Sequence, residues 1–173
     1  NGDAAAAREL SARLAPLCHR VAMRMLADRA EAEDVAQEAM LRLWRIAGQW
    51  RRDEARVSTW LYRVTANLCT DRLRRRRGVG IDDIPEPADG QPGVADRMMA
   101  ADRAAALEKA LSLLPERQRQ AVILRHLEGL SNPEIAQIME IGVEAVESLT
   151  ARGKRALAQA LAGRREELGY DHD

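Results

Sequence analysis

Several features are scarce in this 173-residue sequence, and each scarcity excludes a class of protein. No uninterrupted apolar run approaches the roughly 20 residues that a membrane-spanning helix needs. The two cysteines, Cys18 and Cys69, lack the spacing of a disulfide framework or a zinc knuckle, so we expect two buried thiols. The N-terminal residues lack the cationic and apolar blocks of a signal peptide, which predicts a cytoplasmic protein without membrane insertion.

Catalytic and metal-binding patterns are also missing. The histidines His19, His126 and His172 share no Cys, Asp or Glu constellation at the spacing of a triad or a ligand set. No glycine-rich loop is present that could cradle a phosphate. The sequence therefore predicts neither an enzyme nor a bound metal or cofactor.

Apolar residues instead recur at helical spacing, and no stretch shows the alternation of a β-strand, so we predict an all-α fold. Three helices are expected before residue 78. Their apolar stripes contain Leu10, Leu14, Leu17, Val21 and Met25, then Ala36, Ala39, Met40, Leu43 and Ile46, then Leu61, Val64 and Leu68. Ser58 is the expected N-cap of the third helix.

The second half of the chain predicts a helix-turn-helix. Ser131 and Glu134 have the spacing of a capping box, and Pro133 fits the first turn of a short helix. A break at residues 140–142 precedes a longer helix from about Val143. Expected packing positions are Ile135, Ala136, Ile141, Val146 and Leu157.

Charge is distributed very unevenly, although the formal net charge is zero. Residues 41–80 hold 11 basic and 3 acidic residues, including the unbroken run Arg74 to Arg77. Residues 81–102 hold 1 basic and 6 acidic residues. A concentrated basic stretch is the footprint of a surface that binds a polyanion.

The Gly-, Pro- and Asp-rich stretch that follows the basic run predicts a linker. We therefore divide the chain into a domain at 1–77, an acidic linker at 78–102 and a second domain at 103–173. The linker has the composition of a disordered segment. It is either an inert tether or a segment that imitates RNA, and it could also fold back on the arginine run.

Three motifs, in order and covering nearly the whole chain, resemble the extracytoplasmic-function group of bacterial sigma factors. They are EAEDVAQEAMLRLW, STWLYRVTANLCTDRLRR and LPERQRQAVILRHLEGLSNPEIAQIMEIGVEAVES. The resemblance implies a transcription initiation factor that binds core RNA polymerase, recognises −35 and −10 promoter elements and helps to open the DNA. It also implies an anti-sigma partner.

The first motif resembles the segment with which the family docks on polymerase. Its polar residues fall opposite the apolar stripe of the second helix, at steps of three and four. The predicted docking residues are Asp34, Gln37, Glu38, Leu41, Arg42 and Arg45. The alternative is an ordinary solvated helix face.

The second motif resembles the helix that melts and reads the −10 element. A basic stripe runs along it, opposite Leu61 and Val64, and its guanidinium groups would hold phosphates. The predicted −10 contacts are Trp60, Arg63, Asn67, Thr70, Arg74, Arg75 and Arg77. For Trp60 we favour core packing over base stacking. Where the family usually has Ala-Arg-Asn, this chain has Thr65-Ala66-Asn67, so a usual basic contact is missing.

The third motif resembles the domain that reads the −35 element in the major groove. Its predicted contacts are Glu144, Ala145, Glu147, Ser148, Ala151, Arg152, Lys154 and Arg155. Glu144 and Glu147 are unusual at these positions in the family. Their carboxylates either accept a hydrogen bond from the N4 amino group of a cytosine or complement the dipole of the helix.

A stand-alone dimeric helix-turn-helix regulator is the alternative function. Such a dimer would recognise a palindrome. A helix that only mediated dimerisation would not require a basic stripe that carries Asn67. This stripe therefore favours a transcription initiation factor over a stand-alone dimeric regulator.

Overall fold

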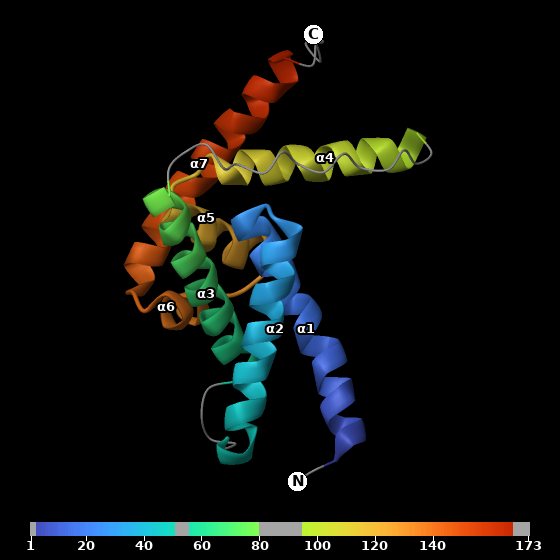
Figure 1. Cartoon of the computed structure of the whole chain (residues 1–173). Coiled ribbons are helices and arrows are strands. Elements are labelled where there is room, and N and C mark those ends of the chain that lie inside the picture. Colours follow the sequence, from blue (N-terminus) through green and yellow to red (C-terminus); the bar gives the residue numbers. More distant parts are fainter. Residues whose placement is uncertain (1–2, 51–55, 80–94, 168–173) are drawn as a thin grey trace.

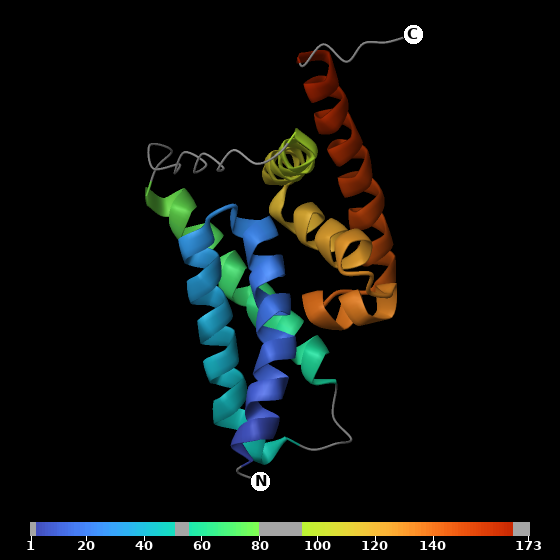
Figure 2. The same cartoon turned by 90° about the vertical axis from the view of Figure 1, so that its right-hand side faces the viewer.

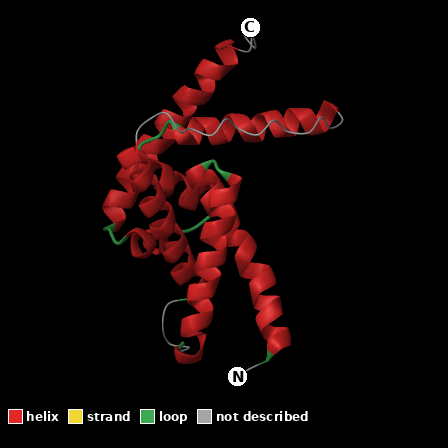
Figure 3. Ribbon diagram, in the orientation of Figure 1, coloured by secondary structure: helices red, strands yellow, loops and turns green. Residues whose placement is uncertain are grey.

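The computed structural model describes residues 3–50, 56–79 and 95–167, and every regular element within them is helical (Figures 1 and 3). The elements are α1 (Ala4–Leu26), α2 (Arg29–Ile46), η1 (Ala47–Gln49), α3 (Val57–Val79), α4 (Ala95–Ser112), α5 (Glu116–Val122), η2 (Ile123–Leu127), α6 (Asn132–Met139) and α7 (Val143–Glu167). The predicted all-α fold is confirmed.

Helices α1, α2 and α3 pack on one another and form the N-terminal unit. Asp3 caps α1 by accepting from the backbone N–H groups of Ala5 and Ala6, and Asp28 caps α2 by accepting from that of Glu31. Val21 and Met25 of the predicted α1 stripe are buried, whereas Leu10 is 39% exposed, so the core begins one turn later than predicted. The three predicted helices are all present.

The beginning of α3 differs from the prediction. The N–H of Trp60 donates to the carbonyl of Arg56 at 3.1 Å, so the first helical hydrogen bond precedes Ser58. Ser58 therefore lies inside the first turn of α3 and is not its N-cap. The prediction was wrong because Val57 already has helical backbone.

The C-terminal unit consists of α4 to α7, and α7 packs on α4, α5 and α6 (Figure 2). Ser131 and Glu134 form the predicted capping box at the start of α6. A turn at residues 140–142 leads into α7, which confirms the helix-turn-helix. Helix α4 begins at Ala95, inside the range predicted as linker, and residues 80–94 of that range lie outside the described residues.

A π-helical segment, η2, directly follows α5 and ends just before Glu128 and Gly129. The N–H of Glu128 donates to the carbonyl of Ile123 at 2.9 Å, and Gly129 has φ +71°, a conformation that glycine adopts without strain. Such wide turns re-aim the residues that follow them. Here the residue that follows is Glu128.

The two units share one core. Val21, Tyr62 and Cys69 of the N-terminal unit belong to the same cluster of buried side chains as Leu124 and Ile135 of the C-terminal unit. Helix α3 also packs directly against α6 (Figure 1). We call this arrangement closed: the helix-turn-helix of the C-terminal unit lies on α3, the predicted −10 helix.

Candidate nucleic-acid interface

The predicted docking face of α2 is exposed. The opposite, apolar face of α2, which includes Ala36 and Leu43, is buried against α1 and α3. All six predicted residues lie on the outward side, where Glu38 accepts from the Arg42 Nε at 3.0 Å. Leu41 is 52% exposed and Trp44 is 37% exposed, three residues apart on one helix surface. Trp44 was missed by the sequence analysis, although its spacing from Leu41 could have identified it.

Helix α3 presents its polar stripe away from α1 and α2. Arg63, Asn67 and Arg74 are exposed, and Thr70 is half-buried. Trp60 packs partly into the second apolar cluster, and its ring meets that of Trp50 edge to face at a centroid distance of 6.0 Å. Its packing role is therefore visible in the structure.

The arginine run at the end of α3 is divided between two environments. Arg76 donates to the Leu26 carbonyl at 2.9 Å and pairs with Glu31 at the start of α2. Arg77 pairs with Glu116 of α5 at 3.0 Å. Arg74 and Arg75 are exposed. Carboxylates of α2 and α5 therefore neutralise part of the positive charge of this arginine run. From the sequence, only the acidic linker was expected to contact the run.

The predicted −35 contacts share the outward surface of α7. All eight, Glu144, Ala145, Glu147, Ser148, Ala151, Arg152, Lys154 and Arg155, are exposed. Gly153, on the opposite side, is buried. A Cβ built there would lie 2.5 Å from Cγ2 of Val122 and 3.0 Å from the Gln118 carbonyl oxygen. Close contact with α5 at Gly153 thus fixes which side of α7 faces outward.

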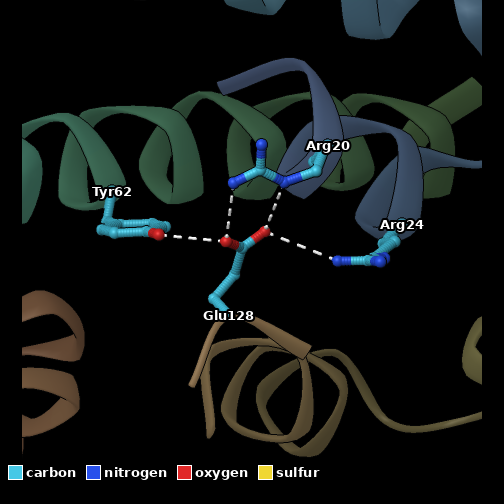
Figure 4. Close-up of polar contacts among 4 residues, drawn as sticks. All are labelled: Arg20, Arg24, Tyr62 and Glu128. Atoms are coloured by element: carbon cyan, nitrogen blue, oxygen red, sulfur yellow. Dashed lines mark hydrogen bonds and ion pairs between the residues drawn. The ribbon is translucent and has the colours of Figure 1, made fainter. Parts of the chain in front are cut away.

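Glu128 occupies a buried polar cluster between the two units (Figure 4). Its side chain is 4% exposed, and the Tyr62 hydroxyl donates to it at 3.0 Å. Arg20 donates through Nε and an NH2 group at 3.3 and 3.1 Å, and Arg24 lies at 3.5 Å. Burial and the Glu128 charge raise the pKa of Tyr62, so its hydroxyl remains the donor. The sequence analysis missed this cluster.

Further polar contacts cross the same boundary. Arg63 of α3 pairs with Glu140, which ends α6 with φ +57°, and Arg119 of α5 donates to the Met25 carbonyl at 2.8 Å. Burial lowers the pKa of Arg119, which also donates to the carbonyls of Ser112 and Leu114. Polar contacts thus surround the shared core on several sides.

Both cysteines are buried and free, as predicted. Burial raises the pKa of the Cys69 thiol to about 12 and also raises that of Cys18. Among the described residues no three His, Cys, Asp or Glu side chains are grouped so that they could hold a metal ion. No described helix is long and apolar enough to cross a membrane.

Two family models match the chain at the positions of these surfaces. Sigma-70 region 2 matches residues 10–79, which contain α3 and the α2 stripe. Sigma-70, region 4 matches residues 104–157, which contain the helix-turn-helix.

Curated relatives extend the similarity over most of the chain. The ECF RNA polymerase sigma factor SigM of Mycobacterium tuberculosis is 36% identical over 160 residues, covering 92% of this chain and 79% of its own length. The RNA polymerase sigma-H factor of Pseudomonas aeruginosa is 37% identical, with coverages of 80% and 77%. The ECF sigma factor SigW of Bacillus subtilis is 31% identical, with coverages of 83% and 82%.

Two solved structures share the fold. The sigma factor RpoE of Bartonella quintana, in complex with the anti-sigma factor NepR, has a TM-score of 0.71 at 22% identity, covering 90% of this chain and 96% of its own. CnrH in complex with the cytosolic domain of CnrY has a TM-score of 0.69 at 23% identity, with coverages of 94% and 91%. From its region 2 and region 4 matches and its relatives, this chain belongs to the extracytoplasmic-function sigma factors of the sigma-70 family, which bind core RNA polymerase and direct it to promoters.

Proposed function

We propose that three separate surfaces carry the steps of initiation in this sigma factor. The α2 face around Asp34, Gln37 and Glu38 docks on core polymerase, the polar stripe of α3 binds the −10 element, and the outward side of α7 reads the −35 element. The observation that carries this assignment is that each predicted set, apart from the partly packed Trp60, lies on one helix surface opposite a buried apolar face.

The assignment divides the chain into functional parts. Residues 1–77 are the polymerase-docking and −10 domain, and residues 103–173 are the −35 domain. Residues 78–102 connect them, with α4 beginning at Ala95. We assign the chain no catalytic activity, cofactor or metal, and place it in the cytoplasm, where core polymerase and promoter DNA are found.

An anti-sigma factor is the expected regulatory partner. RpoE of Bartonella quintana was crystallised with the anti-sigma factor NepR, and the present fold matches that of RpoE. An anti-sigma factor that covered the α2 face would block polymerase, and one that covered the α3 stripe would block the −10 element. The stand-alone dimeric regulator is not favoured, because the relatives are sigma factors.

Charge reversal on α2 tests the docking surface. Asp34→Lys/Glu38→Lys should abolish pull-down of core polymerase, because the partner meets this face directly. The melting temperature should change little, since the exposed Glu38–Arg42 pair contributes only about 0.3 to 0.5 kcal/mol.

The matched control reverses two exposed acidic residues elsewhere, Glu9→Lys/Asp102→Lys. This control should retain polymerase as well as wild type does. Undiminished pull-down by a folded Asp34→Lys/Glu38→Lys variant would show that α2 is not the docking surface.

A further inference from the structure

A group of basic residues lies beside α7, on the side where α5 packs (Figure 2). Helix α5 approaches α7 closely at Gly153, where an added Cβ would lie 2.5 Å from Cγ2 of Val122. Arg125 and His126 follow Val122 by about one helical turn, and Lys154 follows Gly153 directly. Arg125, His126 and Lys154 are all exposed, and we call these three residues the basic corner.

The side chains of the basic corner act on one another. Burial lowers the pKa of His126, and the positive charges of Lys154 and Arg125 lower it further. Salt and water screen the interaction of exposed charges over about 8 to 10 Å, so both cations lie near the imidazole. Arg125 also donates to the Leu130 carbonyl at 2.9 Å, which holds its guanidinium group in place. Three basic side chains therefore meet at one edge of α7.

No carboxylate neutralises the basic corner within residues 3–50, 56–79 and 95–167. Neither Lys154 nor Arg125 forms an ion pair with an acidic side chain there. On α7 itself, Glu147 lies about two turns before Lys154, and Arg155 adds further positive charge. The corner therefore has an excess of positive charge that an anion from outside the chain could neutralise.

The charged groups of the elements that pack around η2 have partners of their own. Arg20 and Arg24 of α1 bind Glu128, which is turned away from α7 into the buried cluster. Glu134 of α6 belongs to the capping box, and Arg119 of α5 donates to backbone carbonyls. The charges of Lys154 and Arg125 are therefore the ones that a ligand at His126 would meet.

A duplex read by α7 would bring phosphates to the basic corner. The major groove is about 12 Å wide and a helix with its side chains is about 10 to 12 Å across, so phosphate backbones border an inserted helix on both sides. The basic corner lies at the edge of the outward surface of α7, where α5 meets that helix. Charged donors such as imidazolium, ammonium and guanidinium groups form strong hydrogen bonds with phosphate oxygens.

From this arrangement we propose that His126, together with Arg125 and Lys154, binds a backbone phosphate of the −35 duplex, and that the protonated imidazole makes a phosphate contact that the neutral imidazole lacks. The inference rests on the proposed role of α7 in binding this duplex. A bound phosphate favours the charged imidazole, and by linkage the charged imidazole favours the phosphate. The gain in affinity should be complete below the pH range in which the free imidazole titrates, and lost above the range in which the DNA-bound imidazole titrates.

The test uses the full chain and a labelled random-sequence duplex of about 20 base pairs, because phosphate contacts do not depend on sequence. Fluorescence anisotropy measures affinity at about pH 5.5 and about pH 8, on either side of the usual range of histidine. His126→Gln keeps a polar side chain that cannot be protonated, and His126→Lys keeps a positive charge at both pH values. The matched control, His19→Gln, removes the half-buried histidine of α1 and leaves the basic corner intact.

Wild type and His19→Gln should bind the duplex about threefold to tenfold more tightly than His126→Gln at the lower pH, and equally tightly at the higher pH. At the lower pH, the slope of log affinity against log salt should be steeper for wild type than for His126→Gln by about 0.9, the value for one phosphate contact on duplex DNA. His126→Lys should bind at both pH values as tightly as wild type does at the lower one.

Equal affinities and equal salt slopes of wild type and His126→Gln at the lower pH would overturn the phosphate contact, and so would an equal loss in His19→Gln. Circular dichroism checks that each variant keeps its helices. Arg152→Ala/Arg155→Ala is measured in parallel. A loss of affinity in that variant without any effect of His126→Gln overturns the phosphate contact alone. If that variant binds the duplex as tightly as wild type does, the proposed role of α7 fails, and the His126 contact fails with it.

Discussion

The two helices that we assign to promoter DNA, α3 and α7, differ in whether their arginine side chains form ion pairs within the chain. On α3, Arg63 and Arg77 are paired with carboxylates of the other unit. On α7, Arg152 and Arg155 are exposed and pair with no carboxylate within the described part of the chain. The C-terminal unit therefore covers part of one proposed DNA-binding surface, that of α3, and leaves the other, that of α7, exposed. The free chain should therefore be able to bind duplex DNA through α7 while it is closed, whereas binding of single strands through α3 requires the two units to separate.

Forcing α3 free of the C-terminal unit should abolish this difference and have the largest effect. Ala66→Arg places a long cationic side chain at a completely buried position, and such overpacking costs about 1 to 3 kcal/mol, which separation of the units relieves. We expect single-strand affinity to rise and the radius of gyration to increase, with helicity by circular dichroism retained. Ala66→Ser is the matched control and should remain closed. A compact, helical Ala66→Arg variant with wild-type affinity would place Ala66 outside the interface.

A pair of arginine substitutions on each helix should sharpen the comparison with a smaller effect. Arg152→Ala/Arg155→Ala should lower the affinity of the free chain for a random-sequence 20-base-pair duplex by at least tenfold, because two phosphate contacts are lost. Arg63→Gln/Arg77→Gln should change it less than twofold, since both guanidinium groups are already occupied. Fluorescence anisotropy measures both. Equal losses would mean that α3 and α7 contribute alike in the free chain.

The smallest effects are expected within α7 itself, where two glutamates differ in position. Glu144 lies in the first turn, where it complements the helix dipole, so Glu144→Gln should cost a few tenths of a kcal/mol of stability and leave base preference unchanged. Glu147 lies beyond that turn and is exposed, so Glu147→Gln should change the preferred base at one −35 position by about 1 to 3 kcal/mol. Selection from a randomised −35 library distinguishes them. An identical consensus for wild type and Glu147→Gln would leave Ser148 and Ala151 as the readers of base edges.

Local signals in the sequence predicted most of the fold. Apolar periodicity predicted the helices of the N-terminal unit, and the capping box at Ser131 and Glu134 predicted where α6 begins, because each signal lies within a few residues of the structure that it specifies. The same locality explains the error at Ser58, where a good capping residue lies one position inside a helix that begins earlier.

Contacts between the units could not be predicted in this way. Glu128 is 66 residues from Tyr62 and 108 from Arg20, and no periodic pattern connects residues at such separations. The π-helical segment that positions Glu128 has no distinctive sequence either. Most of the predicted site residues lie on exposed helix surfaces, but the partners of Arg63 and Arg77 became visible only in the folded chain.

Pairing of Arg63 and Arg77 with glutamates also determines how ionic strength acts on the free protein. A cation that contacts single-stranded DNA normally contributes about 0.7 to the slope of log affinity against log salt, because counterions leave the phosphates. Here each arginine must first leave a carboxylate, which then attracts cations of its own, and the same salt screens the pairs that keep the chain closed. Moderate salt would therefore weaken DNA binding by the free sigma factor less than its number of arginine contacts implies. Once polymerase has separated the units, the full salt dependence of those contacts would return.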